Sequence, residues 1–472
     1  MPAVGSKGRR QFPRFTSSRA MKATPQPDNL SLPCPRTFPW ETLGRALLAV
    51  SLVAVLPIAM YRVLYGSGGT DFPDFYAAGR HVLEHGEIEP TAFLKYYWPS
   101  IDVAFAGLAW MPLPLAAAVW YAIGCLSWIG LLMTIHRLLA SWAASPMARH
   151  ATLAAGLLML PLALDHLCLG AFHILMVWLM VAGLARVGRG HSWSGGVLLG
   201  LGVWIKLLPL LGVGYLVLKR KWLAAGVAVA TALVVDLALA LPAFGPQRTW
   251  ELHVKWWENQ GRGAADRNLS DPGITDEDRI TSQSLAVVLR RLLTRMGWEA
   301  FPGRNSVCLA DLSAGQLRII YLGITGLVGL GIVFYCRRPG TSLDASRWAA
   351  EIALVTLGTL WLSPVVWGYH FTAATPALAV IGARRAQQPR TAWGTAALWL
   401  VAMSLFGWPL ARSFGAVLWI TFALGAILVW SARKTREGPS NAQTQRRGES
   451  VGVVSRVEPQ RLTPPDAGTA NP

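Results

Sequence analysis

The stretch 193-WSGGVLLGLGVWIKLLPLLGVGYLVL-218 decides the fold class of this chain. It is longer than the roughly twenty apolar residues that a helix needs to cross a bilayer. Lys206 and Pro209 nevertheless stand near its middle, where a charge is costly and a proline interrupts the helix. We therefore expect two half-helices that enter the membrane and return, with Lys206 at their tip. The alternative is a plain crossing, which would put basic connectors on the wrong side of the membrane.

The rest of the chain also has the composition of a membrane protein. Of its 472 residues, 53% are hydrophobic and 14% are charged, whereas soluble proteins carry about 25% charged residues. Because backbone groups in lipid must satisfy their own hydrogen bonds, long apolar runs predict helices and not a barrel of short strands. We expect an all-α polytopic bundle of about 11–13 transmembrane or half-spanning helices. The apolar runs cover residues 43–65, 98–111, 113–136, 151–164, 168–185, 193–218, 222–244, 314–336, 348–363, 366–383, 392–408 and 413–432.

The net charge of +18 is explained by membrane topology better than by binding to nucleic acid. Lys and Arg gather in the N-terminal arm, residues 1–40, in the tail, residues 433–472, and in short connectors, as in cytoplasmic loops. Both tails lack apolar periodicity, so we expect them to be disordered and cytoplasmic, with the membrane domain at 41–432. The outer loops of about 66–97 and 245–313 then face the extracytoplasmic side.

Two carboxylates, Asp71 and Asp74, follow the first apolar run in 71-DFPDFYAAG-79. They are three residues apart and would share one face of a helix. One interpretation is that Asp71 only caps the helix that runs through Tyr76. The other is that an acid at the membrane boundary, a costly feature for a helix end alone, serves the chemistry of the protein.

Other ionisable residues converge on the same side of the expected topology. Lys206 would bind an anion such as a phosphate, although snorkelling to the interface is an alternative. Asp165 and His166 lie between two short apolar runs and either contact a substrate or only form a turn. His370, in 363-SPVVWGYHF-371, is either a second donor to an oxyanion or an interfacial residue of an aromatic belt.

The long outer loop contains two segments of interest. Trp, Asn and Gln in 250-WELHVKWWENQGR-262 are typical of sugar-binding surfaces and equally of the bilayer interface. The segment 282-SQSLAVVLRRLLTR-295 has the apolar period of an interfacial amphipathic helix.

Signals of soluble-enzyme chemistry are missing from the sequence. There is no Walker loop, Rossmann fingerprint, HExxH or GxSxG, which points away from ATP-driven transport and nucleotide-sugar donors. The five cysteines are scattered and form no CxxC or Cys/His cluster, so they are expected to be apolar packing residues.

Five short motifs follow one another along the chain: 71-DFPDFYAAG-79, 96-YYWPS-100, 206-KLLP-209, 282-SQSL-285 and 363-SPVVWGYHF-371. Their order and spacing resemble the polyprenol-phosphate-sugar-dependent glycosyltransferases of family 87, over most of residues 43–432. The chain departs from the family pattern at two places. Gly170-Ala171-Phe172-His173 replaces a Gly-Gln-x-Asn, and Tyr369 replaces the first His of a pair. These departures bear on the identity of the sugar and of the acceptor.

The resemblance implies a C-type glycosyltransferase-like bundle with an extracytoplasmic active site and an inverting transfer. Asp71 would be the general base, with Asp74 as the second choice. The donor phosphate would be bound by Lys206, His370 and Arg290. The other residues expected to contact the substrates are Tyr76, Asp165, His166, His173, Gln283, Trp367 and Tyr369.

We therefore expect an enzyme of the cell membrane that moves a hexose, with mannose the expected sugar, from a polyprenyl-phosphate donor to a lipid or glycan hydroxyl. Neither a cofactor nor a metal is expected, and nucleic acid is not an expected partner. The alternative is a polytopic transporter or lipid flippase, which should show ionisable groups near the midplane and paired repeats. A C-type transferase that acts on protein or lipid A is a further possibility.

Overall fold

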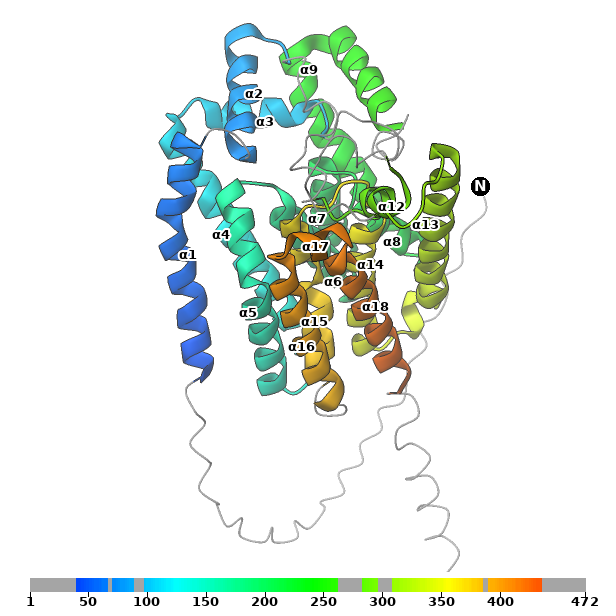
Figure 1. Cartoon of the computed structure of the whole chain (residues 1–472). Helices are drawn as coiled ribbons and strands as arrows, with labels where there is room; N and C mark the ends of the chain where they lie inside the picture. The colour runs from blue at the N-terminus through cyan, green and yellow to red at the C-terminus, as the bar shows by residue number, and fades with distance from the viewer. Residues whose placement is uncertain are drawn as a thin grey trace, which may run out of the picture. The chain divides into compact units, whose positions relative to one another are not determined.

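The computed structural model describes residues 40–66, 70–88, 97–261, 282–295, 308–384 and 389–434. Throughout these ranges the regular elements are helices (Figure 1). The first are α1 (Trp40–Tyr65), α2 (Asp71–His85), α3 (Ser100–Ala109), α4 (Leu113–Leu139), α5 (Ser145–Leu169), α6 (His173–Gly188), α7 (Ser192–Ile205), α8 (Leu210–Leu218) and α9 (Trp222–Gly261). They are followed by α12 (Leu285–Leu293), α13 (Ala314–Cys336), η2 (Gly340–Ser342), α14 (Ala345–Trp361), η3 (Gly368–Ala374), α15 (Thr375–Ala383), α16 (Pro389–Phe406), α17 (Pro409–Ser413) and α18 (Ala416–Lys434). The predicted all-α class is confirmed for the described residues.

Helix length and composition identify the elements that can cross a bilayer. Among the described residues, five helices are long and apolar enough: Glu41–Tyr65, Leu113–Leu139, Ser145–Leu169, Trp222–Glu258 and Ala314–Cys336. Shorter apolar helices are Ser100–Ala109, His173–Gly188, Ser192–Ile205 and Ala416–Ala432. The predicted run 98–111 thus forms a helix of 10 residues, too short for a full crossing.

The segment that decides the fold class is broken as its sequence predicts. α7 ends before Lys206, which has extended backbone angles, and α8 begins after Pro209. The segment that leads into α7 and the second half of α8 both lie at Trp348 in α14. A Cβ atom on Gly188, the last residue of α6, would be 2.2 Å from the Trp348 ring nitrogen, and the rings of Tyr215 in α8 and Trp348 are 5.6 Å apart. α7 and α8 therefore enter and return as half-helices.

Small residues allow α7 to pack closely against α9. A Cβ atom on Gly196 would lie 2.7 Å from the carbonyl oxygen of Ala224, and one on Gly200 would lie 2.4 Å from that of Ala228. Both pairs are four residues apart, the spacing at which small residues let two membrane helices approach closely. Because later residues of α7 meet later residues of α9, the two helices run parallel.

Several predicted boundaries are wrong. Asp165 and His166 do not form a turn but lie near the end of α5, which continues to Leu169 and stops at Gly170, where the backbone is left-handed. The run predicted at 366–383 is split into η3 and α15. The run predicted at 222–244 continues as α9 to Gly261 across a kink at Gly245, where the backbone has φ 73°.

The amphipathic segment 282–295 does form a helix, α12, but its environment differs from the predicted interface. Most of its residues are buried, including Arg290. It packs against α13 and α17, so both of its faces are covered by protein. Most of the predicted tails 1–40 and 433–472, Tyr96 and much of the loops 66–97 and 245–313 lie outside the described residues.

Candidate active site

The candidate site begins at the first residue of α2. Thr70 is the N-cap residue, and its side chain makes no capping hydrogen bond. Asp71 is therefore not the cap. Its partly buried carboxylate accepts a hydrogen bond from the Tyr369 hydroxyl, with 3.3 Å between the two oxygens. Asp74, one turn later, is exposed, so the two acids have different environments.

Aromatic packing holds the start of α2 in place. Phe72 and Phe75 are buried, and their rings lie 6.2 Å from Trp120 and 4.9 Å from Phe105, respectively. Gly170, which ends α5, has φ 69°, and a Cβ atom there would be 2.5 Å from the Cβ of Phe72. Trp120 donates a hydrogen bond to the Gly170 carbonyl at 2.7 Å. Asp71 is thus oriented through its neighbour Phe72, which rests directly on the Gly170 backbone.

Lys206 is the cation of the site. It occupies the break between α7 and α8, and its ammonium group lies 5.7 Å from the centre of the Tyr97 ring. The ammonium is close enough to Asp71 for their charges to interact favourably. Its field also reaches His173 and His370. The structure therefore brings together Asp71, Lys206 and His370, three residues that the sequence motifs placed in one site.

Three histidines and a tyrosine surround Asp71 and Lys206. The ring centres of His173 and His370 are 4.4 Å apart, those of Tyr369 and His370 are 4.5 Å apart, and those of His166 and Tyr369 are 5.6 Å apart. These rings come from α5, α6 and η3, which contact one another. Predicted substrate-binding residues from distant parts of the sequence thus form one cluster.

Backbone hydrogen bonds determine the neutral tautomers of the histidines. His370 Nδ1 accepts from the Trp367 N–H at 2.8 Å, so its proton is on Nε2 and can be donated. His166 Nε2 accepts from the Ile174 N–H at 3.1 Å, which puts its proton on Nδ1. His173 Nε2 donates to the His370 carbonyl at 2.8 Å, which leaves Nδ1 as an acceptor. The Nδ1 atoms of His166 and His173 are buried and form no hydrogen bond with any described residue.

Electrostatics make Asp71 a stronger base than an ordinary aspartate. Burial raises the pKa of its carboxyl group to about 6, and the charge of Asp74 adds to this effect. Lys206 and the Tyr369 hydroxyl act in the opposite direction and keep the pKa from rising further. Partial desolvation also raises the pKa of Asp74, although Asp74 is the more exposed of the two acids. Asp71 is therefore ionised at neutral pH yet retains appreciable affinity for a proton.

Two of the predicted substrate-binding side chains have structural partners. The Tyr76 hydroxyl donates to the Met111 carbonyl at 2.9 Å and so ties α2 to the end of α3. Gln283 Nε2 donates to the Arg412 carbonyl at 3.0 Å, and the Gln283 backbone N–H donates to the Val366 carbonyl at 2.6 Å. Gln283 thus supports the segment that leads to His370, and a contact with substrate stays a prediction for both residues.

The remaining predicted residues lie at varying distance from this cluster. Arg290 is buried within α12, and its role toward a donor phosphate stays a prediction. Asp165 is exposed at the end of α5, where its charge interacts with Arg62 of α1 and reaches Tyr369. Trp367 contributes its backbone N–H to His370, as described above.

Sequence reasoning missed two buried acids. Asp236 in α9 accepts hydrogen bonds from Ser100 and His253. Glu351 in α14 pairs with Lys219 at 2.5 Å, and both side chains are fully buried. The signal was present, because an acid within an apolar run is as unusual as a lysine and demands a partner. Asp236 within 222–244 and Glu351 within 348–363 are recognisable in the same way as Lys206, as charged residues inside apolar runs.

Tyr97 and Gly170 are two further residues of the site whose roles the sequence motifs did not indicate. The Tyr97 ring lies beside the Lys206 ammonium, and the Gly170 backbone packs directly against Phe72. A glycine before a histidine gives no local sign of a partner about a hundred residues away, so only the tertiary structure reveals this function.

The arrangement supports proton abstraction next to an anion. A carboxylate of raised pKa lies within the electrostatic range of a cation, Lys206, in the same cluster as a neutral histidine that offers an N–H donor. Within the described ranges, no three His, Cys, Asp or Glu side chains are placed to hold a metal ion. Transfer without a metal or cofactor stays a prediction.

Comparison with known proteins connects this geometry to a family. The family model of glycosyltransferase family 87 matches residues 96–364, more than half of the chain. Two similar proteins are both described as polyprenol-phosphate-mannose-dependent alpha-(1-2)-phosphatidylinositol mannoside mannosyltransferases. The one from Mycolicibacterium smegmatis is 26% identical over 414 residues, which cover 83% of this chain and 84% of the relative. The one from Mycobacterium tuberculosis is 28% identical over 357 residues, which cover 71% and 74%, respectively.

Among solved structures, the apo Archaeoglobus fulgidus oligosaccharyltransferase aligns with a TM-score of 0.36 and 13% identity. The alignment covers 83% of this chain and 57% of that chain, so this protein spans little more than half of the archaeal one. The range matched by the family model includes Lys206 and ends at Pro364. Asp71 and His370 lie outside that range, and the tertiary structure joins them to it.

Proposed function

Because the chain belongs to glycosyltransferase family 87, we propose that it transfers a hexose, specifically mannose, from a polyprenyl-phosphate donor to a hydroxyl group of a lipid or glycan acceptor. The names of the two similar proteins support the donor and the sugar. The observation that carries the proposal is the partly buried Asp71 carboxylate, held by Tyr369 beside Lys206. Membership in a glycosyltransferase family favours this function over a transporter or flippase.

Asp71 acts as the general base in this reaction. The acceptor oxygen forms a bond to C1 of the sugar while its proton passes to a carboxylate oxygen of Asp71. The bond between C1 and the phosphate oxygen breaks, and its electron pair stays on the phosphate. A single attack from the face opposite the phosphate inverts the configuration at C1. General base catalysis of this kind contributes about 10²–10⁴-fold to a rate.

Lys206 and His370 receive the charge that develops on the leaving group. The departing polyprenyl phosphate is a monoester of low pKa, so it needs cationic stabilisation and no proton. The Lys206 ammonium supplies the charge, and the Nε2–H of neutral His370 supplies a directed hydrogen bond. Arg290 is the predicted third partner of the phosphate.

The acceptor is a lipid or glycan, and we place the reaction on the extracytoplasmic face of the cell membrane. The names of the similar proteins specify a phosphatidylinositol mannoside for those proteins, which supports a lipid-linked glycan here. The site lies at the ends of helices opposite to the basic connectors, and cytoplasmic loops are the ones enriched in Lys and Arg. Both tails are then cytoplasmic.

Sugar transfer in proteoliposomes tests the proposal directly. The protein is supplied with radiolabelled polyprenyl-phosphate mannose and an acceptor lipid, and wild type is compared with Asp71→Asn and Asp74→Asn. We expect Asp71→Asn to lose at least about 10²-fold in rate with donor binding retained, because amide nitrogen cannot accept the proton. Asp74→Asn, which changes an exposed acid of the same helix, should keep most of the activity.

Two outcomes would contradict this assignment. If Asp74→Asn were the inactive variant, Asp74 would be the base. If the wild type transferred no sugar from any polyprenyl phosphate but moved lipid across the bilayer, the transporter alternative would replace the enzyme.

A further inference from the structure

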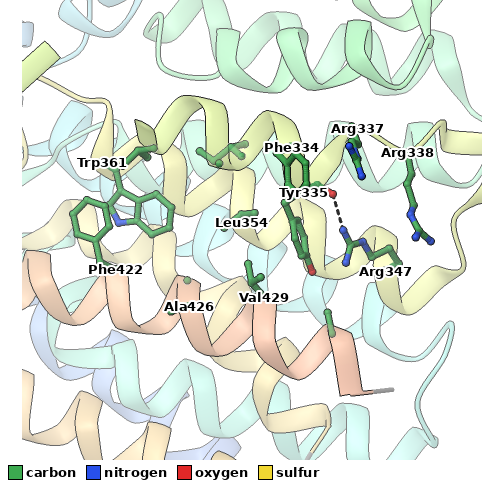
Figure 2. A pocket seen from close by; sticks show the side chains of 15 residues that line it. Phe334, Tyr335, Arg337, Arg338, Arg347, Leu354, Trp361, Phe422, Ala426 and Val429 are labelled. Carbon is green, nitrogen blue, oxygen red and sulfur yellow. Dashed lines mark hydrogen bonds between the residues drawn. The ribbon is translucent and has the colours of Figure 1, made fainter. Parts of the chain in front are cut away.

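A cavity of about 640 Å³ lies away from the candidate active site, between α13, α14 and α18 (Figure 2). Figure 2 shows Arg337, Arg338 and Arg347 at one end and Trp361 with Phe422 at the other. The rings of Trp361 and Phe422 are stacked at 4.8 Å, and Trp361 also donates a hydrogen bond to Thr421. The cavity is thus an elongated groove that is basic at one end and bounded by aromatic rings at the other.

The walls of the groove are apolar and belong to membrane helices. Leu354 of α14 and Ala426 and Val429 of α18 line its length. On α13, Leu327 and Leu330 are exposed by 71% and 67%, as expected for a helix that faces lipid. Gly331 lines the groove, and a Cβ atom added there would meet nothing within 4 Å. The groove therefore offers an apolar surface beside a helix face suited to lipid.

The basic end has positive charge that the protein does not neutralise. Glu351 is shared between Lys219 and Arg347, and Arg347 also donates to the Tyr335 carbonyl at 2.6 Å. The exposed Arg337 and Arg338 form no ion pair with any described residue, and Arg337 stacks on Phe334. The Lys219 ammonium holds the backbone carbonyls of residues 336 and 338, which fixes the chain that carries these two arginines.

A second cavity shows that such a basic end is not a general property of this chain. It measures about 460 Å³ and lies between α1, α4 and α5, with arginines at its rim. There, however, Glu41 pairs with Arg45, Arg149 and His150. In the second cavity only Arg137 of the three lining arginines has no ion pair with a described residue, whereas at the basic end of the first groove both exposed arginines, Arg337 and Arg338, have none.

We propose that the groove between α13, α14 and α18 binds an anionic glycerophospholipid, with the phosphate at Arg337 and Arg338 and an acyl chain along Leu354 toward Trp361. The apolar length suits a hydrocarbon chain, and the unpaired arginines suit a phosphate. The lipid tail of the sugar donor fits less well. Arg347 is about 20 Å along α14 from the turn that leads to His370. A donor whose sugar lies at the candidate active site would have to extend its tail into the groove from the end near Trp361 and Phe422. The tail would then place hydrocarbon against the arginines at the other end.

Native mass spectrometry of the full-length protein in detergent tests the proposal without any sugar transfer. The probes are equimolar dioleoylphosphatidylglycerol and dioleoylphosphatidylcholine. We expect wild type to retain the anionic lipid several-fold better. Arg337→Gln with Arg338→Gln should weaken its binding roughly tenfold, since each arginine near a lipid surface contributes to anion affinity. Gly331→Leu, which fills the groove, should weaken binding of both lipids.

Matched variants control for charge and for volume. Arg186→Gln with Arg189→Gln removes two exposed arginines outside the groove, and Gly326→Leu adds the same side chain to an exposed position of α13 that does not line it. Both should bind like wild type. Equal binding of the two lipids, or normal binding by Gly331→Leu, would overturn the proposal. Displacement of phosphatidylglycerol by undecaprenyl phosphate would assign the groove to the donor lipid, and equal thermal stabilisation by inorganic phosphate alone would reduce it to an anion site.

Discussion

At the scale of single residues, the proposed mechanism depends most on Asp71, whose surroundings shift the pKa of its carboxyl group in opposite directions. Burial and the charge of Asp74 favour the protonated acid, while Lys206 and the Tyr369 hydroxyl favour the carboxylate. The resulting pKa of about 6 suits a general base, which must be ionised at the working pH and still accept a proton. The same contacts orient the carboxylate, because Tyr369 bonds one of its oxygens.

The balance of these contacts predicts a specific pH dependence. If Asp71 is the general base, as proposed, it must be ionised, so the rate of transfer should rise with pH through a limb near pH 6. Lys206→Gln and Tyr369→Phe remove groups that stabilise the carboxylate and should both move this limb to higher pH. Asp74→Asn removes a like charge and should move it to lower pH. Initial rates of sugar transfer measured from about pH 5 to about pH 8 check all three shifts. A limb that stays in place in all three variants would mean that another group titrates.

The contact between α2 and the end of α5 is the decisive feature at the scale of elements. α2 does not cross the membrane by itself, and it is held by its buried phenylalanines and by the Gly170 backbone. The contact with α2 requires a glycine at position 170 for two reasons. Its φ of 69° is unfavourable for other residues, and its missing side chain leaves room for Phe72.

Gly170→Ala should therefore displace Asp71 without touching it. The added methyl group would lie 2.5 Å from the Phe72 Cβ, so the start of α2 must move. A misplacement of about 1 Å costs roughly 100-fold in rate. Gly86→Ala is the matched control, because Gly86 has the same φ of 69° at the other end of α2 but open space around its Cβ position. Transfer rates and melting temperatures of both variants separate the clash from the backbone strain. Equal activity of the two variants would show that the Phe72 contact does not position the base.

At the scale of the whole molecule, polar and charged side chains gather at two opposite ends of the described helices. The cluster around Asp71 lies at one end of α6, which begins at His173, and the basic connector after Gly188 lies at the other. Lys219, Glu351 and Arg347 form a buried network on that second side. Breaking one partner of such a pair would strand a buried charge, so the network holds α8 and α14 together near the basic end.

The proposed orientation predicts which end is accessible from outside the cell. In a variant with the five native cysteines replaced by alanine, Arg80→Cys in α2 should react with a membrane-impermeant maleimide on intact spheroplasts. Arg186→Cys, at the opposite end of α6, should react only after the membrane is opened. Both arginines are exposed, so accessibility to solvent within the protein is matched. The reverse labelling pattern would place the site on the cytoplasmic face.

Features that depend on neighbours along the chain could be predicted from the sequence. Apolar runs specified the helices, because lipid forces the backbone to satisfy its hydrogen bonds locally. Pro209 and Lys206 specified the break between α7 and α8 for the same local reason. Helix boundaries depend in addition on tertiary contacts. His166, for example, lies inside α5 and not in a turn, and its buried ring is satisfied by a hydrogen bond from the Ile174 backbone N–H.

The sequence by itself determined that this is an all-α membrane protein of glycosyltransferase family 87 and that Asp71, Lys206 and His370 are candidates for its chemistry. Only the tertiary structure decided that Tyr369 bonds Asp71, that Gly170 carries Phe72, and that three arginines meet at one end of a lipid-facing groove. The physical reason is the distance along the chain over which each effect acts. Hydrophobicity and backbone preference act over a few residues, whereas the pKa of a carboxylate and the shape of a groove depend on side chains that folding brings together from distant helices.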